Sequence, residues 1–306
     1  MIDGSNCSGT GPLGLCQGRA TRFIFSALLA AAFSFSALAA PPLPLAKTPE
    51  EVGLSSTRLA RLEATTRANV AAGVPAGAVI LIARDGRIAF HRAIGDRDRD
   101  AHDPMRTDAI FRLYSMTKPI VSVAIMQLVE EGRVQLADPV SMYLPEMKGM
   151  KVGVETADAS GRPKLDRVDA AREMTIQDLL RHTSGLVYPG GYDNNEVNRA
   201  YNAAGLLVRD FGSAEFVTRL SKMPLRFSPG TRWEYGVSTD VLGRVLEVIE
   251  KRTLAEVLES RILGPLGMTD TAFFLPAPPA ILIARSRRAR EVSSERTPDS
   301  PRPRGR

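Results

Sequence analysis

Cysteine and histidine are scarce in this sequence of 306 residues, and their scarcity limits its chemistry. It contains two cysteines, Cys7 and Cys16, and three histidines. Both cysteines precede the cleavage site predicted below, so the mature chain would have no disulfide, thiolate nucleophile or cysteine-bound metal. A metal centre also needs clustered histidines and carboxylates, and the three histidines are scattered. The sequence therefore predicts a protein with no metal and no other cofactor.

A basic surface for nucleic acid is also missing, although the net charge is +6. Residues 276–306 hold eight arginines and three acidic residues, and residues 1–39 carry a net charge of +1. Residues 40–275 are therefore neutral, which argues against binding to a phosphate backbone. The segment 276–306 is rich in Arg, Ser and Pro and is predicted to be a disordered basic tail.

One apolar run, from Phe23 to Leu38, bears on targeting. Arg19 and Arg22 precede it, and Ala37-Leu38-Ala39 has the small-x-small pattern of a cleavage site. The run is short for a membrane-spanning helix, which needs about 20 residues. We predict that residues 1–39 are a signal peptide and that the protein is exported, to the periplasm or the extracellular space. The alternative is an uncleaved anchor, the one case in which we expect membrane attachment.

Strand signals are concentrated in one hairpin near the start of the predicted domain. Residues 78–83 form a continuous apolar run, and Asp85-Gly86 is a two-residue turn signal. Residues 87–94 follow as a second strand. The charged segment 95–106 is expected to be a solvated loop.

Helix signals occupy most of the rest of residues 40–275. Ser55 and Ser56 offer an N-cap to a helix that ends at Gly73. Apolar residues at helical spacing between 116 and 131 predict a largely buried helix. Further helices are expected after Thr175, from Ser213, over 237–249 and after Thr253.

Ser115 and Lys118 are the first candidates for catalysis. Ser115 lies where the buried helix begins, near free N–H groups and the positive end of the helix dipole. Residues i and i+3 share a helix face, so the Lys118 amine should stand over the Ser115 hydroxyl. An amine on a desolvated face loses its charge more readily and can take the hydroxyl proton. The alternative is an N-cap serine beside a lysine whose stem lies on apolar surface.

Other serine chemistries fit less well. A nucleophile elbow needs Gly-x-Ser-x-Gly, which the segment 236–240, Gly-Val-Ser-Thr-Asp, does not complete. A Ser-His-Asp triad would have to use His91, His102 or His182. These lie in the second strand, in the charged loop and in a predicted helix end with a turn, respectively.

Five motifs in order resemble the serine β-lactamase and penicillin-binding-protein superfamily, and within it the class C β-lactamase-like carboxylesterases. The first, Phe-Arg-Leu-Tyr-Ser-Met-Thr-Lys-Pro at 111–119, contains the Ser-x-x-Lys signature. The others are Leu-Leu-Arg-His-Thr-Ser-Gly-Leu at 179–186, Phe-Ser-Pro-Gly at 227–230, Tyr-Gly-Val-Ser at 235–238 and Gly-Pro-Leu-Gly-Met at 264–268. The likeness covers roughly residues 50–275. It implies an α+β fold, with an antiparallel sheet flanked by helices and an all-α region.

The resemblance also implies roles for individual residues. Ser115 would be the acylated nucleophile, and Lys118 would hold it and help to deprotonate it. Tyr235 would be the general base, with its phenol pKa lowered by the lysine. Trp233 is expected in the core or in the wall of a substrate cleft. Val237 stands at a substrate-binding position where β-lactamases and peptidases of the family have Asn, which favours esters because Val cannot hydrogen-bond an amide.

The third motif of the family (Lys-Thr-Gly, His-x-Gly or Trp-Gly-Gly) is not found after Tyr235, where Lys251 is followed by Arg-Thr. In the family, its strand supplies a second oxyanion N–H and belongs with two other strands to the central sheet. We therefore expect the domain at 40–275 to be incomplete, truncated or frameshifted at its C-terminus. Weak or absent turnover would follow, because one oxyanion donor is worth about 2.7–4 kcal/mol.

The sequence thus predicts a serine hydrolase that acts on carboxylic esters through an acyl-enzyme, or an inactive chain if it is truncated. A β-lactamase or D-alanyl carboxypeptidase and a non-catalytic fragment remain open as alternatives. The expected partner is a small-molecule ester or β-lactam-like substrate and not a nucleic acid. No oligomeric state is predicted.

Overall fold

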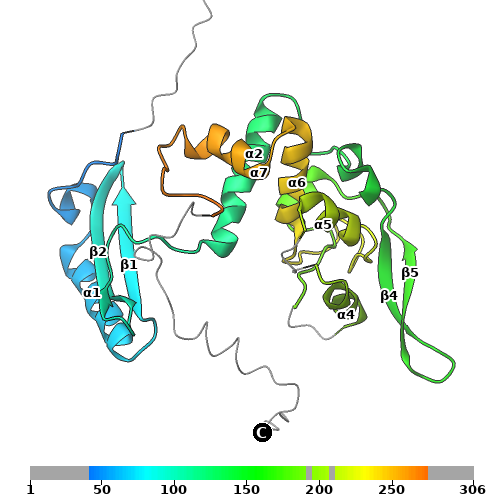
Figure 1. Ribbon diagram of the computed structural model, residues 1–306, viewed down its shortest axis with the longest axis horizontal. Coiled ribbons are helices and arrows are strands. Elements are labelled where there is room, and N and C mark those ends of the chain that lie inside the picture. The colour runs from blue at the N-terminus through cyan, green and yellow to red at the C-terminus, as the bar shows by residue number, and fades with distance from the viewer. Residues whose placement is uncertain (1–40, 191–194, 207–210, 275–306) are drawn as a thin grey trace, which may run out of the picture. The chain divides into compact units, whose positions relative to one another are not determined.

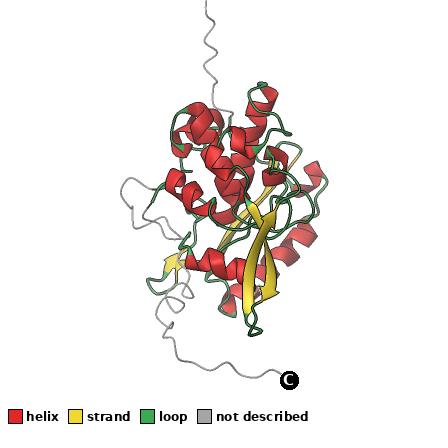
Figure 2. Ribbon diagram, turned by 90° about the vertical axis from the view of Figure 1, so that its right-hand side faces the viewer, coloured by secondary structure: helices red, strands yellow, loops and turns green. Residues whose placement is uncertain are grey.

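The computed structural model describes residues 41–190, 195–206 and 211–274. The predicted signal peptide and the predicted basic tail lie outside the described residues. Within the described part, no helix is long and apolar enough to cross a membrane. The chain combines helices with antiparallel strand pairs, which confirms the α+β class (Figure 2).

The N-terminal elements confirm the predicted helix and hairpin. After a short 3₁₀-helix, η1 (Pro49–Val52), α1 spans Ser56–Ala71, and the Ser55 side chain caps it. Strands β1 (Gly77–Arg84) and β2 (Arg87–Asp98) pair antiparallel, and both residues of the Asp85-Gly86 turn have positive φ. Strand β1 thus begins and ends within one residue of the predicted run, and β2 begins where it was predicted.

The segment 95–106 differs from the solvated loop expected of it. Strand β2 continues to Asp98 and pairs with β3 (Asp103–Pro104), so the sheet order is β1-β2-β3. Arg97 is buried and forms an ion pair with Asp103. An arginine paired with a carboxylate can be buried, and this explains why the charge of the segment misled the prediction.

Helices are the commonest regular element of the described chain after residue 110 (Figure 1). The predicted long helix is a 3₁₀ turn, η2 (Tyr114–Met116), followed by α2 (Thr117–Glu130). The other expected helices are confirmed as α3 (Ile176–Leu180), α5 (Ser213–Leu220), α6 (Ser238–Glu250) and α7 (Leu254–Leu258). The remaining helical segments are η3 (Val140–Met142), η4 (Pro145–Met147), α4 (Glu196–Ala203) and η5 (Glu259–Leu263).

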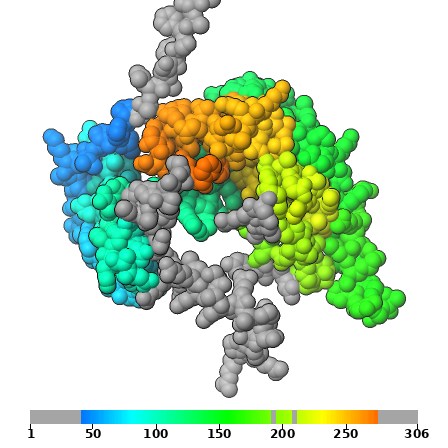
Figure 3. Space-filling view, viewed as in Figure 1, coloured from blue at the N-terminus to red at the C-terminus, as the bar shows by residue number. Residues whose placement is uncertain are grey.

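The core of this helical part lies where α6 meets its neighbours. Val241, Leu242, Val245 and Leu246 of α6 are fully buried, at the spacing of one helix face. Helix α6 contacts α2, α3, α5 and α7. In the space-filling view, the yellow and orange surfaces of residues 213–263 are in contact along this region (Figure 3).

A second hairpin was missed by the prediction, which expected strands in the first hairpin alone. Strands β4 (Lys151–Ala157) and β5 (Pro163–Asp169) pair antiparallel (Figure 1). Most of their residues are exposed or half-buried, so the segment has no apolar run to mark it. The cross-strand pair Val152–Val168 and the turn glycine Gly161, at positive φ, are the signals that could have found it.

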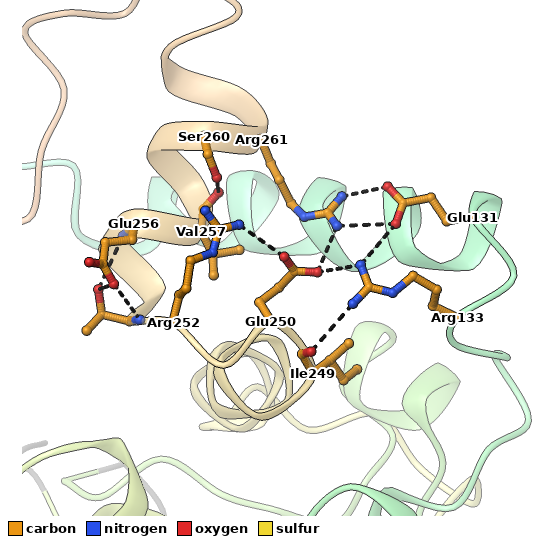
Figure 4. Close-up of polar contacts among 10 residues, drawn as sticks. Glu131, Arg133, Ile249, Glu250, Arg252, Glu256, Val257, Ser260 and Arg261 are labelled. Carbon is orange, nitrogen blue, oxygen red and sulfur yellow. Dashed lines mark hydrogen bonds and ion pairs between the residues drawn. The ribbon is translucent and has the colours of Figure 1, made fainter. Parts of the chain in front are cut away.

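An ionic network joins the ends of three helical segments (Figure 4). Glu250, at the end of α6, accepts hydrogen bonds from Arg133 at 2.6 Å and from Arg261 at 2.8 Å. Arg261, in η5, also donates to Glu131, which follows α2, at 2.7 Å. The network therefore connects the C-terminal ends of α2 and α6 with η5.

Candidate active site

Two side chains converge on the hydroxyl of Ser115. The Tyr235 hydroxyl donates to Ser115 Oγ at 2.6 Å, and Lys118 Nζ donates to the same oxygen at 3.4 Å. Lys118 Nζ also lies 5.0 Å from the centre of the Tyr235 ring. The geometry thus brings a serine hydroxyl, a lysine amine and a phenol close to one another, an arrangement that a nucleophilic mechanism could use.

The backbone around Ser115 presents its side chain to solvent. Ser115 lies in η2, directly before α2, and is exposed, which differs from the desolvated face expected from the sequence. Tyr114 precedes it with φ of 46°, a left-handed conformation that is unfavourable for a bulky residue and that tends to occur at functional sites. Because Ser115 is open to solvent, its activation depends on its two polar neighbours more than on burial.

Tyr235 is held by a second loop of the chain. The segment 182–187, which follows α3, runs beside the segment that leads into α6. The Glu234 N–H donates to the His182 carbonyl at 2.8 Å, and the buried hydroxyls of Ser184 and Ser238 hydrogen-bond at 2.9 Å. The two segments are therefore joined on both sides of Tyr235.

The charges of the site favour an ionised phenol. The hydrogen bond with Ser115 lowers the pKa of Tyr235, and the nearby Lys118 cation lowers it further, although burial acts in the opposite direction. Burial lowers the pKa of His182, and the Lys118 charge adds to that effect. The lowered pKa of Tyr235 favours the phenolate, and the lowered pKa of His182 favours the neutral imidazole.

The two predicted substrate-binding residues have different positions. Trp233 is 66% exposed, and its ring centre is 6.4 Å from that of Tyr235, so it lies beside the catalytic candidates and not in the core. Val237 is 1% exposed and belongs to the helical core. The turn into α6 directs its side chain inward, and its contact with substrate stays a prediction.

Three residues near the site were not predicted as functional. His182 packs on Tyr235 with ring centres 5.0 Å apart, and Tyr188 stacks on Tyr235 at 6.2 Å. Asp240, in the first turn of α6, has a raised pKa because neighbouring protein atoms desolvate its carboxyl, and the Lys118 charge opposes this shift only in part. His182 is the first residue of the His-Thr-Ser-Gly motif, and Tyr188 follows that motif by three residues. Their place in or near a motif was the signal by which they could have been predicted as functional. In the described residues, no group of three or more metal-ligating side chains is placed to hold a metal ion.

Comparisons with known proteins found a matching family model and several similar proteins. The family model described as Beta-lactamase matches residues 62–305. Esterase EstB from Burkholderia gladioli is 39% identical over 206 residues, which are 66% of this chain and 48% of the esterase. Acyltransferase mokF from Monascus pilosus is 35% identical over 245 residues, 77% of this chain and 57% of that protein. The chain thus spans about half the length of these relatives.

A solved structure gives the same result for the fold. The structure titled EstCE1, a hydrolase with promiscuous acyltransferase activity, matches with a TM-score of 0.61 and 28% identity. The match covers 74% of this chain and 55% of EstCE1.

Proposed function

The chain belongs to the beta-lactamase family, and from that premise we propose that it hydrolyses carboxylic esters through an acyl-enzyme at Ser115. The observation that carries the proposal is the convergence of Tyr235 and Lys118 on Ser115 Oγ. The similarity to an esterase supports an ester as the substrate. The esterase and acyltransferase relatives likewise support a small molecule as the substrate.

In the first half of the reaction, the Tyr235 phenolate takes the proton of the Ser115 hydroxyl while Oγ bonds to the ester carbonyl carbon. The tetrahedral intermediate then collapses, the bond to the alcohol breaks, and the Tyr235 hydroxyl returns the proton to the leaving alkoxide. Lys118 contributes its positive charge, which stabilises the phenolate and holds Oγ. The products of this half are a free alcohol and an ester of Ser115.

In the second half, water replaces the alcohol. The Tyr235 phenolate takes a proton from water, the hydroxide attacks the acyl carbon, and the proton passes to Ser115 Oγ as the acyl bond breaks. A carboxylic acid leaves and the serine hydroxyl is restored. The same two groups therefore serve acylation and deacylation.

Labelling of the purified chain with a fluorophosphonate tests the nucleophile directly. We expect one covalent adduct, located on Ser115 by peptide mass spectrometry, and its loss in Ser115→Ala together with hydrolysis of a short-chain nitrophenyl ester. An unlabelled chain would favour the non-catalytic alternative, and an adduct elsewhere would overturn the assignment of Ser115.

The role of Tyr235 is tested by removing its hydroxyl. Tyr235→Phe should lower kcat by about 10²–10⁴-fold, the usual contribution of a general base. Tyr114→Phe is the matched control, since it removes a phenol hydroxyl one residue from the nucleophile, from a side chain that is 72% exposed. Equal rates in the two variants would exclude Tyr235 as the base.

Acyl transfer to an alcohol is a second candidate, favoured by the exposure of Ser115 and of the neighbouring Trp233. An acceptor larger than water can reach an acyl group at such a position. The names of mokF, an acyltransferase, and of EstCE1, a hydrolase with promiscuous acyltransferase activity, also support acyl transfer. Added butanol should then divert the acyl group into a butyl ester, measured by gas chromatography.

The β-lactamase alternative is tested with a chromogenic cephalosporin, whose hydrolysis is measured beside that of the ester.

A further inference from the structure

His182 accepts hydrogen bonds from the N–H groups of both residues that flank Tyr235. Its carbonyl accepts the Glu234 N–H at 2.8 Å, and its Nδ1 accepts the Gly236 N–H at 3.4 Å. The imidazole also lies against the phenol, with ring centres 5.0 Å apart and planes inclined at 35°. One residue therefore holds the chain before Tyr235, the chain after it, and the aromatic ring itself.

The backbone of His182 makes this arrangement possible. Its φ is 56°, in the left-handed region, where Asn, Asp and His occur more often than other side chains. This conformation follows the end of α3, and the Thr183 N–H donates back to the Asp178 carbonyl at 2.8 Å. The turn thus places the ring and the carbonyl of one residue on the same neighbouring segment.

The contact from Gly236 requires a neutral imidazole whose Nδ1 carries no proton. Protonation would turn Nδ1 into a donor that faces another donor, and would add a positive charge beside the phenol. The titratable groups around the ring are Tyr235, which it contacts, and Lys118, whose charge acts on it. Asp240 acts in turn on Tyr235 and is itself influenced by Lys118.

We propose that His182 is a positioning residue, which as a neutral acceptor holds the Tyr235 phenol against Ser115 Oγ. The inference rests on the proposed function for the role of Tyr235. Its geometric part, that His182 fixes the phenol, concerns the folded chain whether or not it turns over substrate.

Two substitutions distinguish the contribution of the His182 aromatic ring from that of its hydrogen-bond acceptor. His182→Phe keeps an aromatic ring and removes the acceptor, whereas His182→Asn keeps an acceptor and tolerates the left-handed backbone. His182→Phe should lower kcat by about 10²-fold with little change in KM, because a misplaced base impairs the chemical step and not binding. His182→Asn should restore most of the lost rate at neutral pH.

His102→Phe is the matched control for backbone strain. His102 has φ of 50°, is exposed, and lies in the turn before β3, away from the site residues in the sequence. It should keep the wild-type rate. Thermal unfolding of all variants will show whether a low rate comes from loss of the folded state.

The acid side of the pH profile gives a readout that a purely structural role would not change. In the wild type, protonation of Tyr235 would stop the reaction and protonation of His182 would slow it, so log kcat/KM should fall with a slope approaching two over the pH range in which both groups take up protons. In His182→Asn one of the two groups is gone, and the slope should be about one. An unchanged slope, or a His182→Asn rate as low as that of His182→Phe, would overturn the proposal.

Titration of the Tyr235 phenol, followed by phenolate absorbance as the difference from Tyr235→Phe, needs no turnover. If His182 holds the phenol at Ser115, His182→Phe should raise the pKa of Tyr235 toward its ordinary value of 10.0. An unchanged titration overturns the positioning role. A raised pKa in a chain whose ester hydrolysis survives Ser115→Ala would keep the positioning role and reject the proposed function.

Discussion

At the scale of single residues, the site depends on two backbone segments that lie too close together to admit an added side chain. Gly236 follows Tyr235, and a Cβ atom there would lie 2.2 Å from the Leu186 carbonyl oxygen and 2.8 Å from its carbon. These are backbone atoms of the neighbouring segment, which cannot move aside as the end of a flexible side chain can. The glycine therefore allows the two segments around Tyr235 to touch.

Gly236→Ala should consequently push these segments apart. We expect a loss of about 1–3 kcal/mol in the free energy of unfolding, as for other overpacked sites, together with a fall in ester hydrolysis. Chemical denaturation and the nitrophenyl ester assay measure the two effects. Gly212→Ala is the control, because a Cβ at Gly212 would meet nothing within 4 Å. Similar stabilities for both variants would contradict the argument.

At the scale of elements, Asp178 organises the turn from which the site segment starts. It is buried in α3 and accepts hydrogen bonds from Arg172 at 2.5 Å and from the Thr183 hydroxyl at 2.9 Å. It also forms a capping box with Thr175. One carboxylate thus caps the helix, pairs with an arginine and fixes the residue after His182.

Asp178→Asn removes the charge without changing the shape of the side chain. The loss of charged hydrogen bonds in a buried position should cost about 2 kcal/mol of unfolding free energy. Asp166→Asn, in β5, removes a carboxylate that is 41% exposed and should cost clearly less, because an ion pair in water contributes little to stability. Urea unfolding measures the free energy of unfolding of the two variants. Equal decreases in that free energy would show that the Asp178 charge does not stabilise the turn more than an exposed carboxylate does.

The ionic network at the helix ends predicts a dependence of stability on pH. Burial acts to raise the pKa of Glu250, but hydrogen bonds from Arg261, Arg252 and Arg133 outweigh it and lower the pKa to about 2. A carboxyl whose folded pKa lies below its ordinary value of 4.5 stabilises the fold above that value. This contribution is lost as the pH falls from about 4.5 toward about 2.

Glu250→Gln should therefore lower the stability at neutral pH and flatten its decline in acid. The expected loss at neutral pH is about 2 kcal/mol, because three charged hydrogen bonds to a side chain that is 9% exposed are weakened. Glu146→Gln, at an exposed residue of η4, is the control and should change neither quantity. Unfolding measured across this pH range would refute the assignment if wild type and Glu250→Gln declined in parallel.

At the scale of the whole molecule, burial is unevenly distributed. Helix α6 has seven buried residues, whereas none of the eight residues of β1 is buried. Leu81, in the middle of β1, is 53% exposed. Apolar burial is the main favourable contribution to folding, so the helical core should be the most stable region of the described chain.

Hydrogen exchange followed by mass spectrometry measures this difference. Peptides from α6 should exchange more slowly than peptides from β1, on the order of tenfold or more, because α6 opens only when the core does. Comparison with α1, which has one buried residue, separates burial from the kind of secondary structure. Equal protection of α6 and β1 would show that the described chain unfolds as a single unit.

The features that could be predicted from the sequence alone are those that depend on residues close together in the chain. The Asp85-Gly86 turn, the capping boxes at Thr175 and Thr253, and the apolar face of α2 could all be predicted, because turn geometry and helical spacing are local. The same reasoning paired Ser115 with Lys118, three residues apart. A hairpin without an apolar run, such as β4–β5, lacks such a signal and was missed.

Contacts between residues far apart in the sequence depend on how the helices and loops pack. Tyr235 lies 120 residues from Ser115, and its contact with the nucleophile exists because α2 packs on α6 and the 182–187 segment supports the turn before α6. The same packing directs Val237 into the core and brings His182 against the phenol. The resemblance to a family suggested the tyrosine, but its distance and its support come from contacts that no local pattern encodes.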